Sequence, residues 1–574
     1  MSGPSRPTDR GPGRGPPRDW KRGSGLGTRA AERASDRASN RVSARDANRA
    51  ANLGYFFAES VARMPGKTAI FDLYGGVERQ LTYAQLDERA DRVAGLLDGL
   101  GVRAGDRVGM IVGNRSEFLE FFFGAMRTGA IPVPINTRLA RETLKFILED
   151  AECRAVFVEP AAHPAAVEVA EDARIVHRIS TDGVAAPGWL DYAPARDASR
   201  RFAVPPELAG DAQAFQPYTS GSTGLPKGAM MSHAGMLWYV DYNQRYWPTS
   251  EDARGMIALP LFHKNAMRGT VKPALFAGAS FVLMPGYEPK AYLEALAKYR
   301  CTYSRGVAAV FTMLLQQRAL IESLDLSALK SLTIGSAVVT PELMDEVERA
   351  LPGVKVGESY GLTEGGSPFR APLDGRATPR GAAGVLAPEI GIRLTDAEGV
   401  ERDLSVDGEV EGELWLNSPY NCLGYHKRPE ATRDKLVDGW LRTGDVVRRD
   451  AQGFFHFKSR VDDMFSCGGE NIYPKEVEDL LFRHPAVANA VVVPIVHSVK
   501  GAVPAAMVVL NRGSSADAET IRAFCLEHGP KYAHPRLVLI VAEGDLPLNG
   551  AGKVDRRLVR ERLAASAQAV TLAG

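Results

Sequence analysis

The segment 218–228, Tyr-Thr-Ser-Gly-Ser-Thr-Gly-Leu-Pro-Lys-Gly, is rich in glycine and hydroxyl residues and contains one lysine. Glycine permits backbone conformations in which successive N–H groups turn toward one anion, and the hydroxyls and the lysine add further donors and a positive charge. This combination is typical of a loop that holds phosphate groups. A flexible Ser/Gly linker is the alternative, but the segment continues into Ala229-Met230-Met231 and not into low-complexity sequence.

The spacing within this loop differs from that of a Walker loop, in which Gly-x4-Gly-Lys is followed by Ser or Thr. Here Gly221 and Gly224 are three residues apart, and Lys227 is followed by Gly228. No hydroxyl is therefore placed next to the lysine to hold magnesium. The sequence predicts a phosphate site of another kind.

Further short motifs follow the loop in a fixed order: Phe262-His263, Gly335-Ser336-Ala337, Tyr-Gly-Leu-Thr-Glu at 360–364, Gly-Trp-Leu-Arg-Thr-Gly-Asp at 439–445, Arg-Val-Asp-Asp at 460–463, Gly-Gly-Glu-Asn at 468–471 and Gly-Ala-Gly-Lys at 550–553. Together with the loop, they resemble the signatures of the adenylate-forming (AMP-binding) superfamily, in its acyl- and aryl-CoA synthetase branch. The resemblance extends over residues 50 to 565.

The resemblance implies an α/β fold with two domains. A large N-terminal adenylate-forming domain would contain β-sheets sandwiched by helices and a small β subdomain, and a small mobile α+β domain would follow it. We expect a disordered basic extension at 1–50, the large ATP- and acyl-binding domain at 51–460, a hinge at 461–463 and a C-terminal catalytic lid domain at 464–574. By resemblance, Asp462 is the hinge residue about which the small domain rotates between the two half-reactions.

The implied reaction follows from the chemistry of carboxylates. A carboxylate is a poor acyl donor because oxide is a poor leaving group, so transfer of AMP from ATP must come first. The resemblance therefore implies an ATP-dependent carboxylate:CoA ligase that forms acyl-AMP, releases diphosphate and then forms an acyl-CoA thioester, with ATP, Mg²⁺ and coenzyme A as cofactors. One alternative is a stand-alone adenylating enzyme that loads a separate carrier protein. Another is a catalytically silent binding protein, which the presence of Lys553, Glu364 and Asp445 disfavours.

Residue roles also come from the resemblance. Lys553, Glu364 and His263 are the predicted catalytic residues; Lys553 would stabilise negative charge during adenylation, and Glu364 would be the magnesium ligand. Asp445 would accept hydrogen bonds from the ribose hydroxyls, and Tyr360 would offer a flat face to the base. The full predicted set for nucleotide and coenzyme A is Thr219, Ser220, Gly221, Ser222, Thr223, Gly224, Lys227, Glu358, Ser359, Tyr360, Thr363, Asp445, Arg460, Gly468 and Gly469.

The predicted acyl pocket consists, by resemblance, of Trp238, Tyr239, His263, Val307, Ala308, Gly335, Ser336, Ala337 and Gly361. Its aromatic walls favour an aromatic, cyclic or medium-chain acid. His263 stands where amino-acid-activating relatives carry an aspartate, which disfavours an amino-acid substrate. Lys264 departs from the small or polar residue expected there. It is expected to face solvent, and the alternative is that it pairs with a second carboxylate on the substrate.

Hydrophobic periodicity predicts the elements that must position these residues. Beyond the segment 81–86, a helix would place Leu86, Ala90, Val93, Ala94 and Leu97 on one face. Short apolar runs followed by turn residues predict buried strands at 107–112, 155–158 and 281–284. Helices that alternate with such strands are typical of an α/β body.

The character of the sequence changes near Arg460. Tyr473-Pro474 can begin a helix that turns Val477, Leu480 and Leu481 inward, because proline fits the first helical turn. Strands at 488–493 and 505–510 and a helix at 518–527 would complete a small α+β module.

Composition bounds the remaining alternatives. The chain has 574 residues, which is too long for a single hydrophobic core and predicts several domains. No apolar run is long enough for a membrane-spanning helix. Five widely separated cysteines form neither a CxxC pair nor a zinc spacing, which favours a reducing compartment and hence the cytoplasm. Residues 1–50 hold 11 arginines and one lysine against five acidic residues, but no apolar face accompanies the arginines. We expect a small-molecule carboxylic acid as partner, no nucleic acid and no membrane span; a homodimer is compatible with the sequence.

Overall fold

The computed structural model describes residues 44–219, 225–335, 339, 341–396, 398–467, 470–497, 500–531, 533–548 and 554–573. Residues 48–574 form one compact unit. Helix α2 (Ala44–Ala51) begins inside the segment 1–50 that the sequence predicts to be disordered, so regular structure starts earlier than expected. Residues 1–43, which carry most of the arginines of the segment 1–50, lie outside the described residues.

The first sheet is parallel throughout, with strand order β4-β3-β5-β6-β7. Its strands are β3 (Arg107–Ile111), β4 (Ile131–Pro134), β5 (Cys153–Val158), β6 (His177–Ser180) and β7 (Leu190–Asp191). In β5, Ala155 and Phe157 belong to one core cluster, whereas Val156 and Val158 belong to another. Both faces of the sheet are therefore buried, as expected of parallel strands with helices on each side.

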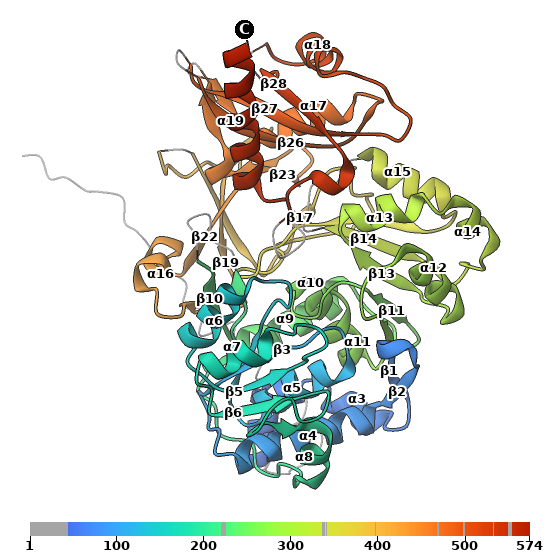
Figure 1. Ribbon diagram of the computed structural model, residues 1–574, viewed down its shortest axis with the longest axis vertical. Helices are drawn as coiled ribbons and strands as arrows, with labels where there is room; N and C mark the ends of the chain where they lie inside the picture. The colour runs from blue at the N-terminus through green and yellow to red at the C-terminus, as the bar shows by residue number, and fades with distance from the viewer. Residues whose placement is uncertain are drawn as a thin grey trace, which may run out of the picture. The chain divides into compact units, whose positions relative to one another are not determined.

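The helices of this region are α4 (Tyr83–Gly99), α5 (Ser116–Arg127), α6 (Arg141–Asp150), α7 (Ala166–Asp172) and α8 (Tyr192–Ala198). Figure 1 shows α6 and α7 on one side of β3, β5 and β6, and α4 and α8 on the other. Helix α4 confirms the sequence prediction, since Leu86, Ala90, Val93, Ala94 and Leu97 are all fully buried. A capping box begins α4, in which the Thr82 hydroxyl accepts from the N–H of Gln85 and the Gln85 side chain accepts from the N–H of Thr82.

The second sheet has the order β15-β14-β13-β11-β12-β1-β2, and only the β1–β2 pair is antiparallel. Its strands are β1 (Thr68–Asp72), β2 (Arg79–Thr82), β11 (Arg254–Ile257), β12 (Ser280–Leu283), β13 (Tyr303–Gly306), β14 (Ser331–Gly335) and β15 (Lys355–Ser359). The helices α12 (Pro289–Lys298), α13 (Ala308–Leu315) and α15 (Pro341–Ala350) pack on one face, where Met256, Val282 and Ile334 lie. Parallel strands end at one edge of a sheet, so the residues that follow β13, β14 and β15 lie near one another.

A third, antiparallel sheet has the order β16-β17-β23-β22-β19-β18, and β21 pairs with β22. Its strands are β16 (Phe369–Arg370), β17 (Gly384–Leu386), β18 (Gly391–Thr395), β19 (Val410–Asn417), β21 (Leu436–Val437), β22 (Trp440–Arg449) and β23 (Phe454–Arg460). Helix α16 (Pro429–Lys435) lies beside it. A small sheet joins β8 (Gln213–Phe215), β9 (Tyr218–Thr219), β10 (Lys227–Ser232) and β20 (Gly424–Tyr425).

Among its described residues, the large domain also contains five further α-helices and one π-helical turn. They are α3 (Ala58–Arg63), α9 (His233–Tyr246), α10 (Lys264–Ala266), a π-helical turn (Met267–Val271), α11 (Lys272–Ala277) and α14 (Arg318–Ser323). Single π-helical turns occur frequently at functional sites, because the extra residue in the turn changes the direction in which side chains point.

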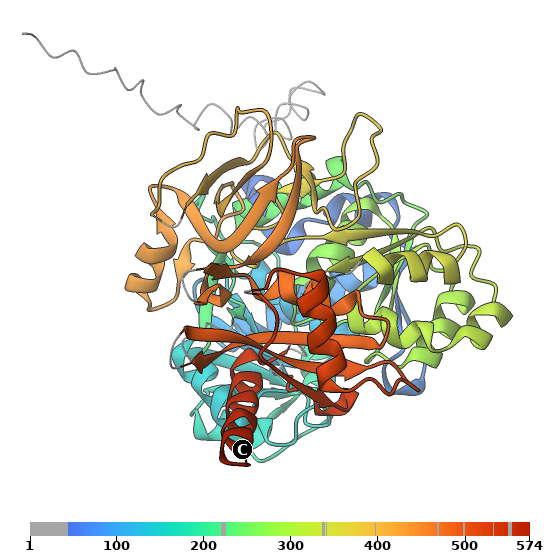
Figure 2. The same cartoon turned by 90° about the horizontal axis from the view of Figure 1, so that it is seen from above.

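The small C-terminal domain contains β24 (Phe465–Cys467), β25 (Glu470–Ile472), β26 (Val487–His497), β27 (Gly501–Leu510) and β28 (Leu537–Val541). Helices α17 (Pro474–Phe482) and α18 (Ala518–His528) pack with Ala490 and Val492 of β26, and α19 (Arg556–Ala573) packs with Val491 and Val493. Figure 2 views this domain from above, with α19 as the red helix at the C-terminus. The predicted fold class, an α/β large domain followed by a small α+β domain, is confirmed.

The contact between α4 and α5 depends on Arg127, which is fully buried. Its guanidinium lies 2.7 Å from a carboxylate oxygen of Asp87 and 2.6 Å from one of Asp91, and Nε donates to the carbonyl oxygen of Gly54. All of these acceptors belong to elements packed around the end of α5. One side chain therefore satisfies several buried acceptors.

We expect Arg127→Met to destabilise the protein by about 3 kcal/mol, because it removes the buried cation beside Asp91 and leaves that carboxylate paired only with the half-exposed Arg201. Thermal or urea unfolding, compared with the exposed variant Arg103→Met, measures this effect. Arg103 pairs with Asp98 at the surface, so its loss is expected to cost less than about 1 kcal/mol. Equal midpoints for the two variants would contradict the structural role of Arg127.

Candidate functional site

The predicted phosphate loop is carried by an antiparallel hairpin. Thr219 of β9 pairs with Lys227 of β10, and Tyr218 pairs with Gly228. Gly228 is required by the close approach of Gln216, because a Cβ at this position would lie 2.6 Å from its amide nitrogen. The hairpin therefore fixes the two ends of the loop, while its central residues 220–224 lie outside the described part of the chain.

The carboxylate of Glu364 lies at the base of this hairpin. Its Oε1 accepts hydrogen bonds from the Thr219 hydroxyl at 3.3 Å and from the Tyr425 hydroxyl at 3.1 Å. Lys227 is close as well, with Nζ 5.8 Å from the centre of the Tyr425 ring. The structure thus brings a predicted metal ligand next to both ends of the predicted phosphate loop, although they are more than a hundred residues apart in sequence.

The predicted base-binding segment directly follows β15. Gly335, the last residue of β14, pairs with Ser359, the last residue of β15. A Cβ on Gly335 would lie 2.3 Å from the Ser359 hydroxyl, so only glycine allows this approach. Glu358 precedes Ser359; burial raises the pKa of its carboxyl to about 7, and its Oε2 has no hydrogen-bond partner among the described residues.

Tyr360, Asp445 and Arg460 form one hydrogen-bonded group. The Tyr360 hydroxyl donates to Oδ2 of Asp445 at 2.5 Å, and Nη1 of Arg460 donates to Oδ1 at 2.6 Å. Asp445 is only 5 % exposed and is paired with Arg460 across β22 and β23. Burial, and then Asp445, raise the pKa of Tyr360 well above its ordinary value. A carboxylate held in this way is a hydrogen-bond acceptor of fixed orientation, as recognition of a diol requires.

Aromatic side chains form the walls of the predicted acyl pocket. Trp238 stacks on Tyr242 at 5.0 Å, and the ring of Tyr239 lies 4.4 Å from that of Tyr420. Gly366 touches the Tyr239 ring, because a Cβ there would lie 2.9 Å from it. The walls are therefore packed against one another and against backbone.

His263 and Lys264 lie at the start of α10. His263 precedes the helix with extended backbone, and its ring lies 5.0 Å from that of Phe262. The prediction that Lys264 faces solvent is wrong. Lys264 is half-buried, and its Nζ donates to the carbonyl oxygen of Gly361 at 2.9 Å. The short helix directs this lysine toward the segment that follows β15, which spacing in the sequence did not reveal.

Three further cations lie beside this region, and none of them belongs to a motif recognised in the sequence. The guanidinium of Arg268 lies 5.5 Å from the Tyr239 ring centre, and a Cβ on Gly361 would lie 2.5 Å from its Nη2. Arg305 is on β13, and Lys272, only 3 % exposed, has Nζ 5.0 Å from the Phe215 ring centre. The available signal was an arginine inside the strand Tyr-Ser-Arg-Gly, a second arginine in the turn that leads into α11 and a lysine as the first residue of α11.

Burial affects these cations differently. It lowers the pKa of Lys272 to about 7, with Arg268 as the second cause, and it also lowers the pKa of Arg305. For Arg268, burial acts in the same direction, but the hydroxyls of Tyr239 and Tyr420 outweigh it and raise the pKa. Arg268 is thus held by tyrosines, whereas Lys272 and Arg305 occupy surroundings that disfavour their charge.

Several predicted site residues take no part in the contacts described above. Lys553, Gly468, Gly469, Ser336 and Ala337 lie outside the described residues, as does the side chain of Asp462. Thr363 is half-buried in the turn closed by Leu362 and Gly366. Val307 is the N-cap residue of α13, and Ala308 is its first residue. Cys467, interpreted as a packing residue, is buried in the core of the C-terminal domain.

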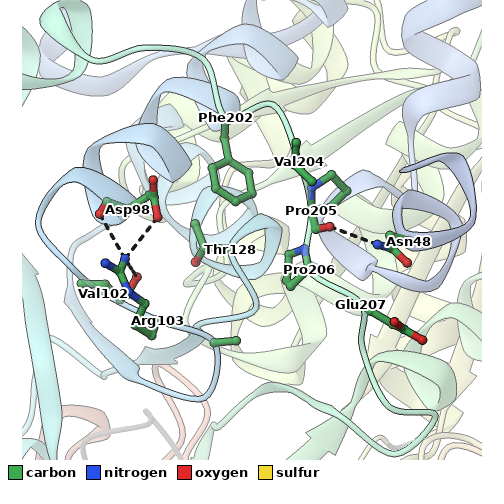
Figure 3. A pocket seen from close by; sticks show the side chains of 11 residues that line it. Asn48, Asp98, Val102, Arg103, Thr128, Phe202, Val204, Pro205, Pro206 and Glu207 are labelled. Carbon is green, nitrogen blue, oxygen red and sulfur yellow. Dashed lines mark hydrogen bonds and ion pairs between the residues drawn. The ribbon is translucent and has the colours of Figure 1, made fainter. Parts of the chain in front are cut away.

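Other features of the described residues add no second site. The pocket in Figure 3, between Asp98 and Arg103 on one side and Phe202 and Pro206 on the other, contains none of the predicted site residues. No three His, Cys, Asp or Glu side chains are grouped so as to hold a metal by themselves, as far as the structure describes the chain. Within the same ranges, no helix is both long and apolar enough to cross a membrane.

Comparison with known proteins gives consistent matches along the chain. Residues 57–426 match the AMP-binding enzyme family, and residues 476–553 match the AMP-binding enzyme C-terminal domain. The chain is 34% identical to a feruloyl-CoA synthase of Amycolatopsis sp over 507 residues, covering 87% of this chain and 97% of that protein. It is 33% identical to the indoleacetate–CoA ligase of Aromatoleum aromaticum, covering 87% and 96%.

Solved structures agree with these matches. The anthranilate CoA ligase AuaEII in complex with anthranoyl-AMP superposes with a TM-score of 0.81 at 25% identity, covering 90% of this chain and 98% of that one. ATP-bound MatB from Rhodopseudomonas palustris gives a TM-score of 0.79 at 28% identity, covering 89% and 99%. Since the family match spans more than half of the residues and the motifs stand in the order found here, this chain belongs to the AMP-binding enzyme family, in its acyl-CoA synthetase branch.

Proposed function

We propose that this protein is an ATP- and Mg²⁺-dependent acid–thiol ligase that activates an aromatic, cyclic or medium-chain carboxylic acid as acyl-AMP and transfers the acyl group to coenzyme A. The observation that carries the proposal is the convergence of Glu364, Thr219 and Lys227 at one end of a site whose other end is the Tyr360–Asp445–Arg460 group. A polyphosphate needs cations and hydroxyls, and a ribose needs a fixed carboxylate.

The donor set near Glu364 fits a magnesium ion that is bound together with ATP. Mg²⁺ usually keeps several waters and is held by one or two carboxylates plus substrate phosphates. Glu364 supplies one carboxylate beside the loop hairpin, which agrees with the lack of a three-ligand cluster among the described residues. The ion would neutralise phosphate charge where the carboxylate of the acid approaches.

The aromatic walls support the choice of acid. Trp238 and Tyr239 are held by stacking and by contact with Gly366, so they form a rigid boundary. Three relatives are named for acids that contain an aromatic ring: a feruloyl-CoA synthase, an indoleacetate–CoA ligase and an anthranilate CoA ligase. These names support a ring-bearing acid for this chain.

A panel of carboxylic acids with ATP, Mg²⁺ and coenzyme A tests the reaction. Diphosphate, AMP and acyl-CoA should appear in equal amounts with at least one acid of this class. Diphosphate release without a thioester, together with acylation of an added carrier protein, would favour the carrier-loading alternative. If no acid across a broad panel yields diphosphate, the proposed function is wrong.

Lys553 has the role of stabilising charge during adenylation only. We expect Lys553→Ala to lower acid-dependent diphosphate release by roughly 100-fold or more, as for loss of a donor to a developing charge. Thioester formation from chemically prepared acyl-AMP should stay within about threefold of wild type. Lys531→Ala, at an exposed lysine of the same domain, is the matched control. Equal losses in both half-reactions would contradict this assignment.

Glu364 has the role of magnesium ligand. Glu364→Gln keeps the shape of the side chain but removes its charge, so we expect the Mg²⁺ concentration for half-maximal diphosphate release to rise about tenfold. A magnesium titration at saturating ATP measures this shift. Glu251→Gln, which breaks an exposed ion pair with Arg63, is the control. An unchanged magnesium requirement in Glu364→Gln would refute the role.

A further inference from the structure

The acyl side of the site contains more positive charge than its own residues neutralise. Arg268, Lys272 and Arg305 form no ion pair with a carboxylate in the part of the chain that the structure describes. Lys272 is buried, and Arg268 and Arg305 are half-buried. A cation withdrawn from water without an anion is costly, and proteins usually pair such groups or place them at a site for a charged ligand. These three residues will be called the cation cluster.

Arg305 is the arginine of the cluster that lacks hydrogen bonds in the described structure. The groups that act on its charge are Arg268, which repels it, and the hydroxyls of Tyr239 and Tyr303. No hydrogen bond to its guanidinium is found among the described residues, and a guanidinium carries five N–H donors. Arg268, in contrast, donates to the carbonyl oxygen of Leu362 and bonds the Tyr420 hydroxyl.

The cluster borders the acyl pocket and not the nucleotide end of the site. Arg305 lies on β13, two residues before Val307. A Cβ on Gly269 would lie 2.5 Å from Cδ of Arg305. Gly269 follows Arg268 in the π-helical turn, and Arg268 reaches Gly361 and the Tyr239 ring. The cluster therefore lies next to the residues that form the predicted walls for the acyl group.

The nucleotide end of the site already has its own charges. Lys227 flanks the phosphate loop, and Arg460 is bound to Asp445. The cluster is thus a separate source of positive charge, and an anion elsewhere on the acid is the simplest partner for it.

We propose that the acid activated by this protein carries a second anionic group, a carboxylate, which Arg305 binds while Arg268 and Lys272 add to the positive field around it. This inference rests on the proposed function, and it narrows the substrate to a dicarboxylic acid with an aromatic, cyclic or medium-length body. The Tyr239 wall would pack against that body between the two carboxylates.

Two matched pairs of acids test the inference: terephthalate against 4-methylbenzoate, and suberate against octanoate. We expect wild-type kcat/KM for thioester formation to be at least tenfold higher for the dianion in one pair. Arg305→Met should lower kcat/KM for that dianion by roughly 10- to 100-fold, as for loss of a charge-assisted hydrogen bond, and leave the monoanion within about threefold. Arg305→Lys should restore part of the loss.

The control variant is Arg318→Met, which removes an arginine that is 60% exposed and pairs with Glu346. It should leave both pairs of acids unaffected. Arg305→Met is expected to fold, because methionine is apolar and of similar length and replaces an unpaired charge. A melting temperature equal to or above that of wild type would support this reading of Arg305, and Arg305→Gln provides a second neutral variant.

Calorimetric binding of the same acids, without ATP, separates this inference from the proposed function. Tighter binding of the dianion that is lost in Arg305→Met supports the inference even if no thioester forms, whereas that lack of thioester would contradict the proposed function. Equal loss for both members of a pair would mean that Arg305 binds the reacting carboxylate, and it would overturn the inference. The inference would also be overturned if the wild-type protein neither binds nor turns over the dianions better than the monoanions.

Discussion

The hydrogen bond from Tyr360 to Asp445 is the interaction on which the arrangement of the site depends. Tyr360 directly follows β15, at the edge of the parallel sheet, and Asp445 lies within β22 of the antiparallel sheet. The bond thus links two sheets of different construction. Asp445 is also held by Arg460 through strand pairing, so its orientation is set from both sides. Because Gly361 and Glu364 follow Tyr360 within one short segment, their positions against Arg268 and Thr219 depend on the same link.

Close backbone approach is the second constraint. Gly335 meets Ser359 at the ends of two parallel strands, and Gly361 and Gly366 meet Arg268 and Tyr239. A Cβ at any of these positions would overlap a neighbour, so each glycine keeps two segments nearer than side chains would allow. The segment after β15 therefore lies directly against both the cations and the aromatic wall. A glycine in this context is a packing requirement and not a sign of flexibility.

The sequence predicted local elements and chemical motifs well, and it failed where a contact depends on the tertiary fold. Helix α4 was predictable because its buried residues repeat with helical spacing, and α17 because proline marks its first turn. The pairing of Glu364 with Thr219 was implied only by the order of motifs. Lys264 was assigned to solvent because lysine usually lies there, but the short helix α10 directs it inward. Arg305 carried no motif, and the absence of a carboxylate partner for it among the described residues appears only once β13, β14 and the π-helical turn are assembled.

Because of the cation cluster, the acid that the pocket accepts cannot be inferred from the aromatic residues alone. Apolar walls select an acid by its size and shape, and one methylene group more or less changes its binding free energy by only about 1–3 kcal/mol. A half-buried charge such as that of Arg305 discriminates more strongly, because an acid without the matching anion leaves the cation unpaired. Replacement of Arg305 by an apolar residue would relieve the protein of an unfavourable charge in the absence of ligand. The retention of that charge beside Tyr239 and Val307 is therefore best explained by the acid, whose second carboxylate would compensate it only when bound.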